Sequence, residues 1–419
     1  MTRSTAQPQT STFEKLHRAK EASHKLARLS TDEKNAVLRS MAAQIAKNEG
    51  RIFAANQIDL AATDLRPFSR DRLLLNPERM SAMAKGLQAV INLPDPVGQV
   101  VEEWVRPNGL RIRKVRVPLG VVGVIYESRP NVTVDATALA LKAGNAVVLR
   151  GGREAAYTNE VLVESLVQAR GLPAGAIELL DSRSRDSVDE LMGARGLVDV
   201  LVPRGGADLI NRIVEKAKVP TIETGAGNCH VYVDKAADLD MADRIVVNAK
   251  TQRPSVCNAA EKLLVHREVA AEYLPRIVRR LQGGGVEVRG DEETRRLTTG
   301  LHVLPASDED WLMEYLDLRI AVHVVGSLQE AIDHINRYST LHSEAIVTRD
   351  EGRARRFLNQ VDSSAVYWNA STRFTDGGEF GFGTEMGIST QKLHCRGPFG
   401  LVELTSTKYQ ILGSGQVRT

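Results

Sequence analysis

Residues 120–152 read GVVGVIYESRPNVTVDATALALKAGNAVVLRGG, and this stretch decides the fold. Two apolar runs, 121–126 and 145–150, flank a segment in which apolar residues recur at helical spacing up to Gly144. Short apolar runs joined through a helix are typical of parallel strands, because a parallel pair needs a crossover connection. The stretch therefore predicts one strand–helix–strand unit within a sheet that helices cover on both faces.

The same alternation of strand and helix continues along the chain. Further short apolar runs, bounded by glycine or proline, occur at 176–180, 197–202 and 219–223. Five such strands alternating with helices predict an α/β fold with a parallel sheet, and right-handed crossovers make this sheet doubly wound.

Two glycine pairs follow strands of the predicted sheet: Gly151 and Gly152 after one strand, and Gly205 and Gly206 after another. Doubly wound sheets bind ligands beyond the carboxyl ends of their strands, where glycine lets the backbone approach a phosphate group. Neither pair belongs to the GxGxxG fingerprint of dinucleotide-binding domains. On these residues alone, a nucleotide site and a pair of ordinary loops are equal alternatives.

A second α/β unit is predicted after residue 223. Its strands are expected at 230–234, 262–266 and 319–325, and its helices at 238–250, 268–282 and 328–338. We expect a loop or a short helix over the polar residues 283–296, and a final strand at 403–412. Residues 369–400 are rich in Gly, Ser and Thr, and predict a loop system of a length that usually carries function.

Two further features precede the stretch at 120–152. Ser30 and Glu33 have the spacing of a capping box, so a helix is expected from residue 31, whereas the polar first 15 residues are expected to be a frayed lead-in. Residues 97–118 alternate apolar and polar side chains around a Pro-Asn-Gly turn, which predicts a hairpin with one solvated face. The basic residues of this hairpin fit that solvated face better than a nucleic-acid strip.

Composition limits the class of protein. With 419 residues the chain exceeds one compact core, so two or three domains are expected. Its 42% hydrophobic and 26% charged residues are typical of a globular protein, and a net charge of +3 argues against an extended nucleic-acid surface. No apolar run approaches the ~18–20 residues that span a bilayer, and the amino terminus lacks the apolar core of a secretion signal. We therefore expect a cytoplasmic protein that binds neither membranes nor nucleic acid.

The three cysteines are Cys229, Cys257 and Cys395, too few for a disulfide framework and without the spacing of a metal site, so no metal is expected. Cys257 follows a turn at Arg253 and Pro254, between a predicted helix and a predicted strand. A nucleophilic cysteine must be a thiolate beside a cation or a helix amino terminus, and Arg253 is a nearby cation. A small buried thiol is the alternative, and the residues alone leave both interpretations open.

Longer strings make the chain recognisable. The segments 123–152, GLPAGAIELL (171–180), LVPRGG (201–206) and ETGAGN (223–228) resemble the cofactor domain of the aldehyde dehydrogenase superfamily. More narrowly, the chain resembles the family of γ-glutamyl phosphate reductases, or glutamate-5-semialdehyde dehydrogenases. This similarity lies in YESRPNVTVD (126–135), VNAKTQRPSVCNAAEKLLVH (247–266), HSEAIVT (342–348), SSAVYWNASTRFTDG (363–377) and STQKLHCRGPFGL (389–401). It extends over nearly the whole chain.

The resemblance implies an enzyme of L-proline biosynthesis that uses NADP(H). Such an enzyme reduces L-glutamyl 5-phosphate with NADPH to L-glutamate 5-semialdehyde and releases phosphate. The resemblance also implies that Cys257 is the nucleophile and carries a thioester intermediate. Two alternatives stay open: an NAD(P)-dependent aldehyde dehydrogenase that hydrolyses its thioester, and a non-catalytic binding relative that keeps the fold.

The resemblance further implies the residues of the site. The oxyanion of the intermediates is expected to bind the main-chain N–H of Cys257 and the side-chain amide of Asn131. Arginines suit the anionic groups of the substrate by bidentate pairing, and the candidates are Arg253, Arg373 and Arg129. The residues expected on the cofactor side are Arg150, Gly151, Gly152, Gly205, Gly206 and Glu223.

Two of these cofactor-side residues carry specific expectations. Arg150 would place a cation where it can meet the 2′-phosphate of NADP. Glu223 matches the glutamate that activates water in hydrolytic aldehyde dehydrogenases, and a purely structural position at a strand end is the alternative that we favour.

The expected domains also follow the superfamily. We expect a Rossmann-like cofactor domain at 1–98 and 119–228, a catalytic domain at 229–398, and a β oligomerisation arm at 99–118 and 399–419. An exposed hairpin is marginally stable alone, so the arm predicts a homodimer or a larger homo-oligomer. The lability of acyl phosphates also leaves open a complex with glutamate 5-kinase, which makes the substrate.

Overall fold

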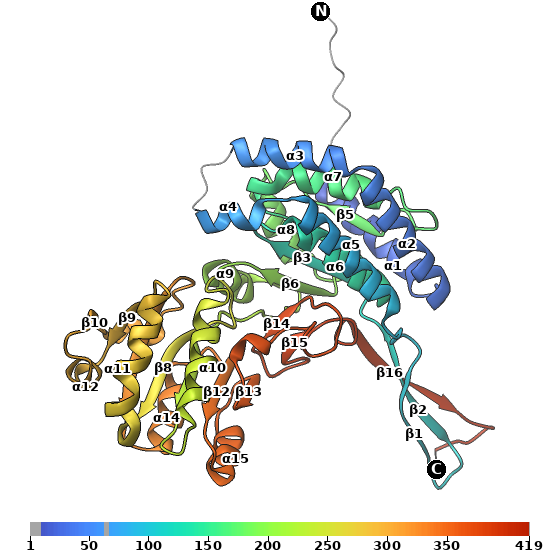
Figure 1. Cartoon of the computed structure of the whole chain (residues 1–419). Coiled ribbons are helices and arrows are strands. Elements are labelled where there is room, and N and C mark those ends of the chain that lie inside the picture. Colours follow the sequence, from blue (N-terminus) through green and yellow to red (C-terminus); the bar gives the residue numbers. More distant parts are fainter. Residues whose placement is uncertain (1–9, 63–66, 419) are drawn as a thin grey trace, which may run out of the picture. The chain divides into compact units, whose positions relative to one another are not determined.

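The computed structural model describes residues 10–62 and 67–418 (Figure 1). The chain divides into two compact units by its internal contacts. The first unit comprises Met1–Glu223, Gly381–Gly387 and Phe399–Thr419, and the second comprises Thr224–Phe380 and Ile388–Pro398. The boundary at Glu223 falls a few residues ahead of the expected one at 228, and the arm segments belong to the first unit. The functional roles expected for these parts stay predictions.

Five helices begin the first unit, and capping residues fix where the first two start. Ser11 and Ser30 each accept a hydrogen bond from the main chain three residues on, where Glu14 and Glu33 bond back. The helix expected after Ser30 is confirmed, whereas the frayed lead-in is wrong from residue 12 onward, and residues 1–9 lie outside the described residues. The helices are α1 (Thr12–Leu26), α2 (Thr31–Lys47), α3 (Glu49–Ala62), α4 (Pro67–Leu73) and α5 (Pro77–Asn92).

A four-stranded parallel sheet follows, in the order β5-β4-β3-β6. Its strands are β3 (Val121–Tyr126), β4 (Ala146–Arg150), β5 (Ile177–Leu179) and β6 (Val200–Arg204). The helices of this region are α6 (Pro130–Lys142), α7 (Ala156–Leu166), α8 (Asp186–Gly193) and α9 (Ala207–Lys216), with a 3-10 turn η1 at Arg153–Ala155. The chain builds outward from β3 through β4 to β5 and then returns to β6 on the other side of β3. The strand order therefore reverses between β3 and β6, as in a doubly wound sheet, and the expected fold class is confirmed.

The fifth strand expected at 219–223 does not form. Thr221 makes a single parallel bridge to Leu201, whose main chain bonds to Pro220 and Ile222. Pro220 has no N–H and cannot extend the ladder beyond this bridge. Glu223 consequently follows an isolated bridge rather than ending a strand.

Seven parallel strands form the core of the second unit, in the order β10-β9-β11-β8-β7-β12-β13. They are β7 (Cys229–Val233), β8 (Ala260–His266), β9 (Glu287–Gly290), β10 (Val303–Pro305), β11 (Arg319–Val325), β12 (Ser343–Val347) and β13 (Ala365–Trp368). The adjacent strands β8, β7 and β12 are buried at every residue. The helices are α10 (Leu239–Thr251), α11 (Arg267–Gly283), α12 (Glu292–Leu297), α13 (Asp308–Leu312), α14 (Leu328–Tyr338) and α15 (Glu351–Gln360).

The region 283–296 differs from the expectation of a loop or a short helix, because it also contains β9. Val288 in β9 is buried beside Ile320 of β11 in one hydrophobic cluster. Four residues that alternate between half-buried and buried positions are too short a pattern to recognise among charged neighbours. The loop system expected at 369–400 contains only short elements: η2 (Thr372–Phe374), β14 (Gly387–Ser389) and β15 (Gly397–Phe399).

The hairpin expected at 97–118 is confirmed. Strands β1 (Val100–Val105) and β2 (Arg111–Pro118) pair antiparallel, and Gly109 between them adopts a positive φ of 83°. The final strand β16 (Thr405–Leu412) pairs antiparallel with β2, which gives a three-stranded sheet (Figure 1). Exposed apolar residues lie on both edge strands: Val100, Val101, Val105, Tyr409, Ile411 and Leu412.

No helix among residues 10–62 and 67–418 is long and apolar enough to cross a membrane. Within the same residues, none of the three cysteines forms a disulfide, and no cluster of His, Cys, Asp or Glu has the arrangement of a metal site.

A buried ion pair holds α2 to the loop after α5. Lys34 Nζ lies 2.5 Å from Asp95 Oδ2, and their side chains are 2% and 8% exposed. Asp95 also accepts hydrogen bonds from Thr31 Oγ1 at 2.9 Å and from the main chain of Val97 at 3.0 Å. Removing the aspartate charge would leave the lysine buried without its counter-ion, which is far costlier than losing an exposed pair.

We predict that Asp95→Asn lowers the free energy of unfolding by about 3 kcal/mol, the usual cost of breaking a buried pair. The matched control is Glu164→Gln, which removes the exposed pair between Arg51 and Glu164 and should cost less than ~1 kcal/mol. Urea denaturation of both variants measures the difference. Equal losses in the two variants would contradict the prediction.

Candidate active site

Cys257 lies in the loop between α10 and β8, residues 252–259, here called the cysteine loop. Helix α10 ends at Thr251, and Pro254 follows at a distance typical of prolines that stop helices. Cys257 is partly exposed, whereas Asn258 and Ala259 are buried. The loop therefore fixes its carboxyl half in the core and leaves the thiol accessible at the surface of the unit.

Asn258 anchors this loop to the segment around η2. Its side-chain Nδ2 donates to the carbonyl oxygens of Thr375 at 2.8 Å and Arg373 at 3.3 Å. Its main-chain carbonyl accepts from Thr372 Oγ1 at 2.7 Å. Cys257 is thus followed by Asn258, which hydrogen-bonds to the segment around η2 through both its side chain and its main chain.

Two arginines lie near the thiol. Arg373 donates from Nε to Gln252 Oε1 at 2.9 Å and from Nη1 to Asn258 Oδ1. Burial lowers the pKa of the Arg373 guanidinium, the nearby Cys257 sulfur opposes this shift, and the charge of Arg253 adds to it. Arg253 is exposed, and no ion pair or hydrogen bond of its side chain occurs within the described residues. The structure therefore brings together Cys257, Arg253 and Arg373, and cations beside a cysteine favour its thiolate.

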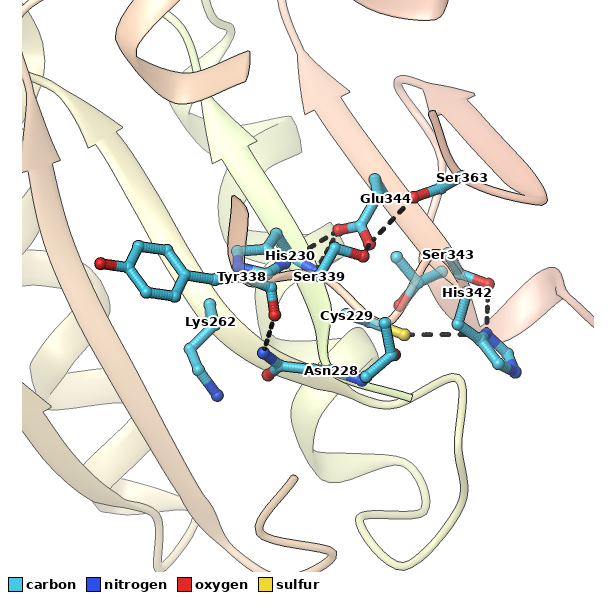
Figure 2. A network of polar contacts seen from close by, with 12 residues as sticks. Asn228, Cys229, His230, Lys262, Tyr338, Ser339, His342, Ser343, Glu344 and Ser363 are labelled. Atoms are coloured by element: carbon cyan, nitrogen blue, oxygen red, sulfur yellow. Dashed lines mark hydrogen bonds and ion pairs between the residues drawn. The ribbon is translucent and has the colours of Figure 1, made fainter. Parts of the chain in front are cut away.

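A buried polar network lies in the same unit, on β7, β12 and the segments around them (Figure 2). Glu344 Oε2 accepts the main-chain N–H of His230 at 2.7 Å and lies 3.0 Å from His230 Nδ1. Ser339 and Ser363 donate to Glu344 Oε1, the latter at 3.3 Å. Burial raises the pKa of Glu344 to about 8 and lowers the pKa of His230 well below its usual value. Both groups are therefore neutral at pH 7, so the network adds little charge beneath the cysteine loop.

Sequence reasoning missed several residues of this region: Gly227, Cys229, His230, Asn258 and Glu344. The sequence assigned no role to Cys229, yet its Sγ lies 3.2 Å from the carbonyl oxygen of Cys257. The string HSEAIVT carried a signal, since three polar residues open an apolar run that is buried throughout. A buried polar residue in a strand needs a partner, which could have identified Glu344 as part of a network.

In the first unit, the glycine pairs follow β4 and β6, at the same edge of the sheet as the end of β3. A Cβ at Gly151 would lie 2.2 Å from Asn159 Nδ2, and one at Gly205 would lie 2.7 Å from Glu127 Oε2. At Gly151 the chain passes too close to the buried Asn159 for a side chain, whereas the close atom at Gly205 is the end of the flexible Glu127 side chain. A Cβ at Gly206 would meet nothing within 4 Å, so the backbone there is open to a ligand.

Gly206 precedes α9, and its N–H donates to Glu127 Oε2 at 3.0 Å. An anionic oxygen thus already binds the amino terminus of this helix, as the helix dipole favours. A cofactor phosphate would compete with Glu127 for the same N–H. The residues at this edge fit the phosphates of a dinucleotide, provided that Glu127 gives way.

The Arg150 side chain hydrogen-bonds to other residues of the chain. Its guanidinium donates to the carbonyl oxygens of Gly151 at 3.0 Å, Ser184 at 3.0 Å and Ser182 at 3.2 Å, and to Ser187 Oγ at 3.3 Å. Burial lowers the pKa of Arg150, and nearby carboxylates oppose the shift. Three of these four bonds tie the end of β4 to residues 182–187, which sequence reasoning did not anticipate.

The remaining residues expected in the site, Arg129, Asn131 and Glu223, also belong to the first unit. Arg129 immediately precedes α6 and its side chain makes no capping bond to that helix, and Asn131 lies in the first turn, where its Nδ2 donates to Asp135 Oδ2 at 3.0 Å. Ser128, with a positive φ of 31°, bonds through its main chain and its Oγ to Glu154 Oε1 at 2.7 and 2.6 Å. Glu223 is half-buried at the end of the unit.

Comparisons with known proteins identify the family. Residues 4–298 match the model of the aldehyde dehydrogenase family. The chain is 64% identical to the γ-glutamyl phosphate reductase of Koribacter versatilis, over 97% of this chain and all of that one. It is 57% identical to the γ-glutamyl phosphate reductase of Carboxydothermus hydrogenoformans, over 96% of this chain and 98% of that one.

Solved structures agree with this identification. The γ-glutamyl phosphate reductase of Thermotoga maritima is 47% identical and superposes with a TM-score of 0.94, over 98% of this chain and all of that one. An acetylating aldehyde dehydrogenase from Geobacillus thermoglucosidasius is 18% identical with a TM-score of 0.69, over 97% of each chain, and shares the fold. The resemblance inferred from the sequence is confirmed: the chain belongs to the aldehyde dehydrogenase family and, within it, to the γ-glutamyl phosphate reductases, which are oxidoreductases.

Proposed function

We propose that this enzyme reduces L-glutamyl 5-phosphate to L-glutamate 5-semialdehyde with NADPH and releases phosphate, in L-proline biosynthesis. The names of its relatives support this substrate, since the γ-glutamyl phosphate reductase of Koribacter versatilis is 64% identical over its full length. The observation that carries the chemistry is the position of Cys257, partly exposed between a buried anchor and two arginines.

In the proposed first step, the Cys257 thiolate attacks the carbonyl carbon of the acyl phosphate. A C–S bond forms, the C–O bond to phosphate breaks, and phosphate leaves with the electron pair, so no strong general acid is needed. The thioester then accepts a hydride at the same carbon, and collapse of the resulting thiohemiacetal releases the aldehyde and restores the thiol. Bound NADPH supplies that hydride.

The roles of the remaining residues follow from their contacts. The main-chain N–H of Cys257 and the amide of Asn131 are our proposed donors to the oxyanion, and Asp135 holds one N–H of that amide in place. Arg253, Arg373 and Arg129 are proposed for the substrate anions.

On the cofactor side, the backbone at Gly151, Gly152, Gly205 and Gly206 is proposed to accommodate the pyrophosphate, supported by the anionic oxygen already bound at Gly206. We propose that Arg150 favours NADP(H) indirectly, because three of its bonds hold residues 182–187 while its charge stays at the end of β4. Glu223 is proposed to have a structural rather than a catalytic role, since it follows an isolated bridge.

The reverse reaction distinguishes this proposal from hydrolysis of the thioester. We predict that NADPH formation from L-glutamate 5-semialdehyde requires inorganic phosphate and rises with its concentration, because phosphate must cleave the acyl-enzyme. Cys257→Ala should abolish turnover while retaining NADPH binding, and Glu223→Gln should keep most activity. Turnover that is independent of phosphate and lost in Glu223→Gln would establish the hydrolytic alternative instead.

The arginines can be separated in the same assay. Arg253→Ala should raise the KM of either phosphate or semialdehyde roughly 10- to 100-fold, the size of one charge-assisted hydrogen bond, and the KM that rises identifies the anion that Arg253 binds. Arg373→Lys should instead lower kcat, since a lysine has one nitrogen in place of the planar Nε and Nη1 pair that bonds to Gln252 and Asn258. Arg295→Ala, an exposed arginine on α12, is the charge-matched control and should change neither constant. Unchanged constants in Arg253→Ala would exclude it from substrate binding.

We also propose that the sheet of β1, β2 and β16 pairs with another subunit, at least as a dimer. Its edge strands expose apolar side chains, including Val105 and Ile411, both 62% exposed, and open sheet edges of this kind favour association. Analytical ultracentrifugation at micromolar concentration should give at least a dimeric mass, and Ile411→Lys should shift it toward the monomer. A monomeric mass for the unmodified chain would contradict the proposal. A complex with glutamate 5-kinase stays a prediction.

A further inference from the structure

The carbonyl group of Cys257 is held from two directions within the second unit. Cys229 Sγ donates a hydrogen bond to its oxygen at 3.2 Å. The main chain of Gly227 packs against the same group so closely that a Cβ at Gly227 would lie 1.4 Å from the oxygen. Gly227 is itself fixed, since its N–H donates to Glu314 Oε1 at 2.7 Å. The carbonyl therefore has little freedom to rotate.

Cys229 is suited to act as the donor in this contact. It is the first residue of β7 and has no exposed surface. Burial raises the pKa of its thiol well above the usual value, so the sulfur keeps its proton. His342 Nδ1 lies 3.9 Å from the sulfur and 2.8 Å from Ser343 Oγ (Figure 2). The two cysteines thus differ in burial and in protonation: Cys229 is fully buried and keeps its S–H as a donor, whereas Cys257 is partly exposed.

The direction of this carbonyl determines the direction of the next N–H. The described residues contain no cis peptide bond, and in a planar trans peptide the C=O of one residue and the N–H of the next point in opposite directions. The N–H of Asn258 therefore points away from the fully buried Cys229. Asn258 is 5% exposed, and its side chain and carbonyl are bonded, but no partner of its main-chain N–H occurs among residues 10–62 and 67–418.

An unpaired N–H on a buried residue is rare in folded proteins and indicates a missing acceptor. The residue after a nucleophile can supply such a donor, as the main-chain N–H does in α/β-hydrolases. In the proposed reaction, the acceptor that would come next to this N–H is the oxygen of the acyl group carried by Cys257.

We propose that Cys229 is a positioning residue: by fixing the Cys257–Asn258 peptide, its thiol aims the main-chain N–H of Asn258 at the oxyanion of the acyl-enzyme. This inference rests on the proposed function, because it requires an acyl group on Cys257. It adds a third donor to the two already proposed for the oxyanion, and it gives a reason for a buried cysteine behind the reactive one.

The test uses the full chain and ¹³C-carbonyl acetyl phosphate as the probe. Acetylated enzyme is examined by isotope-edited infrared spectroscopy, since a hydrogen bond to the thioester carbonyl lowers its stretching frequency. Cys229→Ala should raise this frequency and lower kcat about tenfold, the effect of one hydrogen bond, with the KM of NADPH unchanged. Cys229→Ser, which keeps a donor, should give intermediate values. Cys395→Ala, the same change at another buried cysteine of the unit, should match the unmodified enzyme.

A second variant approaches the same carbonyl from its other side. Gly227→Ala places a methyl group against the Cys257 carbonyl, so the frequency should again rise, and this variant decides the matter if Cys229→Ala does not fold. A folded Cys229→Ala or Gly227→Ala enzyme with an unchanged frequency and kcat would overturn the inference. Acylation of the unmodified enzyme at a residue other than Cys257, with acetyl phosphate or with L-glutamyl 5-phosphate, would instead overturn the proposed function.

Discussion

The amide of Asn258 ties the cysteine loop to the segment around η2, and the proposed chemistry depends on this attachment. Its Nδ2 bonds two carbonyl oxygens beyond residue 372, and its Oδ1 accepts from Arg373. One buried residue thus sets the position of the thiol on one side and of a guanidinium on the other. A thioester mechanism needs this arrangement, because the sulfur must be accessible to substrate while its main chain stays fixed for the oxyanion.

Electrostatics separates the surface of the site from the core beneath it. Burial keeps Glu344, His230 and the Cys229 thiol in their neutral forms, whereas Lys250 and Glu261 of the same unit form a fully buried ion pair. The cationic groups near the thiol are the guanidinium groups of Arg253 and Arg373, and the Asp376 carboxylate also acts on Arg373. Cationic groups stabilise a thiolate and attract an acyl phosphate, so the same pair of residues serves both the nucleophile and the substrate.

The parts of this protein that could be predicted from the sequence are those with a local signal. The apolar residues 121–126 and 146–149 form the strands β3 and most of β4 between glycines, and Ser30 and Glu33 form their capping box within four residues. The expected strand at 219–223 failed because tertiary pairing could not continue past Pro220. The contact between Cys229 and Cys257 could not be predicted, since it exists only because β7 and β8 pair in the folded sheet. Family resemblance pointed to Cys257 but carried no information on the buried thiol behind it.

The central claim is that Cys257 becomes covalently acylated during turnover. Enzyme quenched in a single turnover with an acyl phosphate, then digested and analysed by mass spectrometry, tests this claim directly. The account predicts one acyl group, on the peptide that contains Cys257, and its disappearance when NADPH is added before the quench. An adduct on a different peptide, or none at all during productive turnover, would contradict the account.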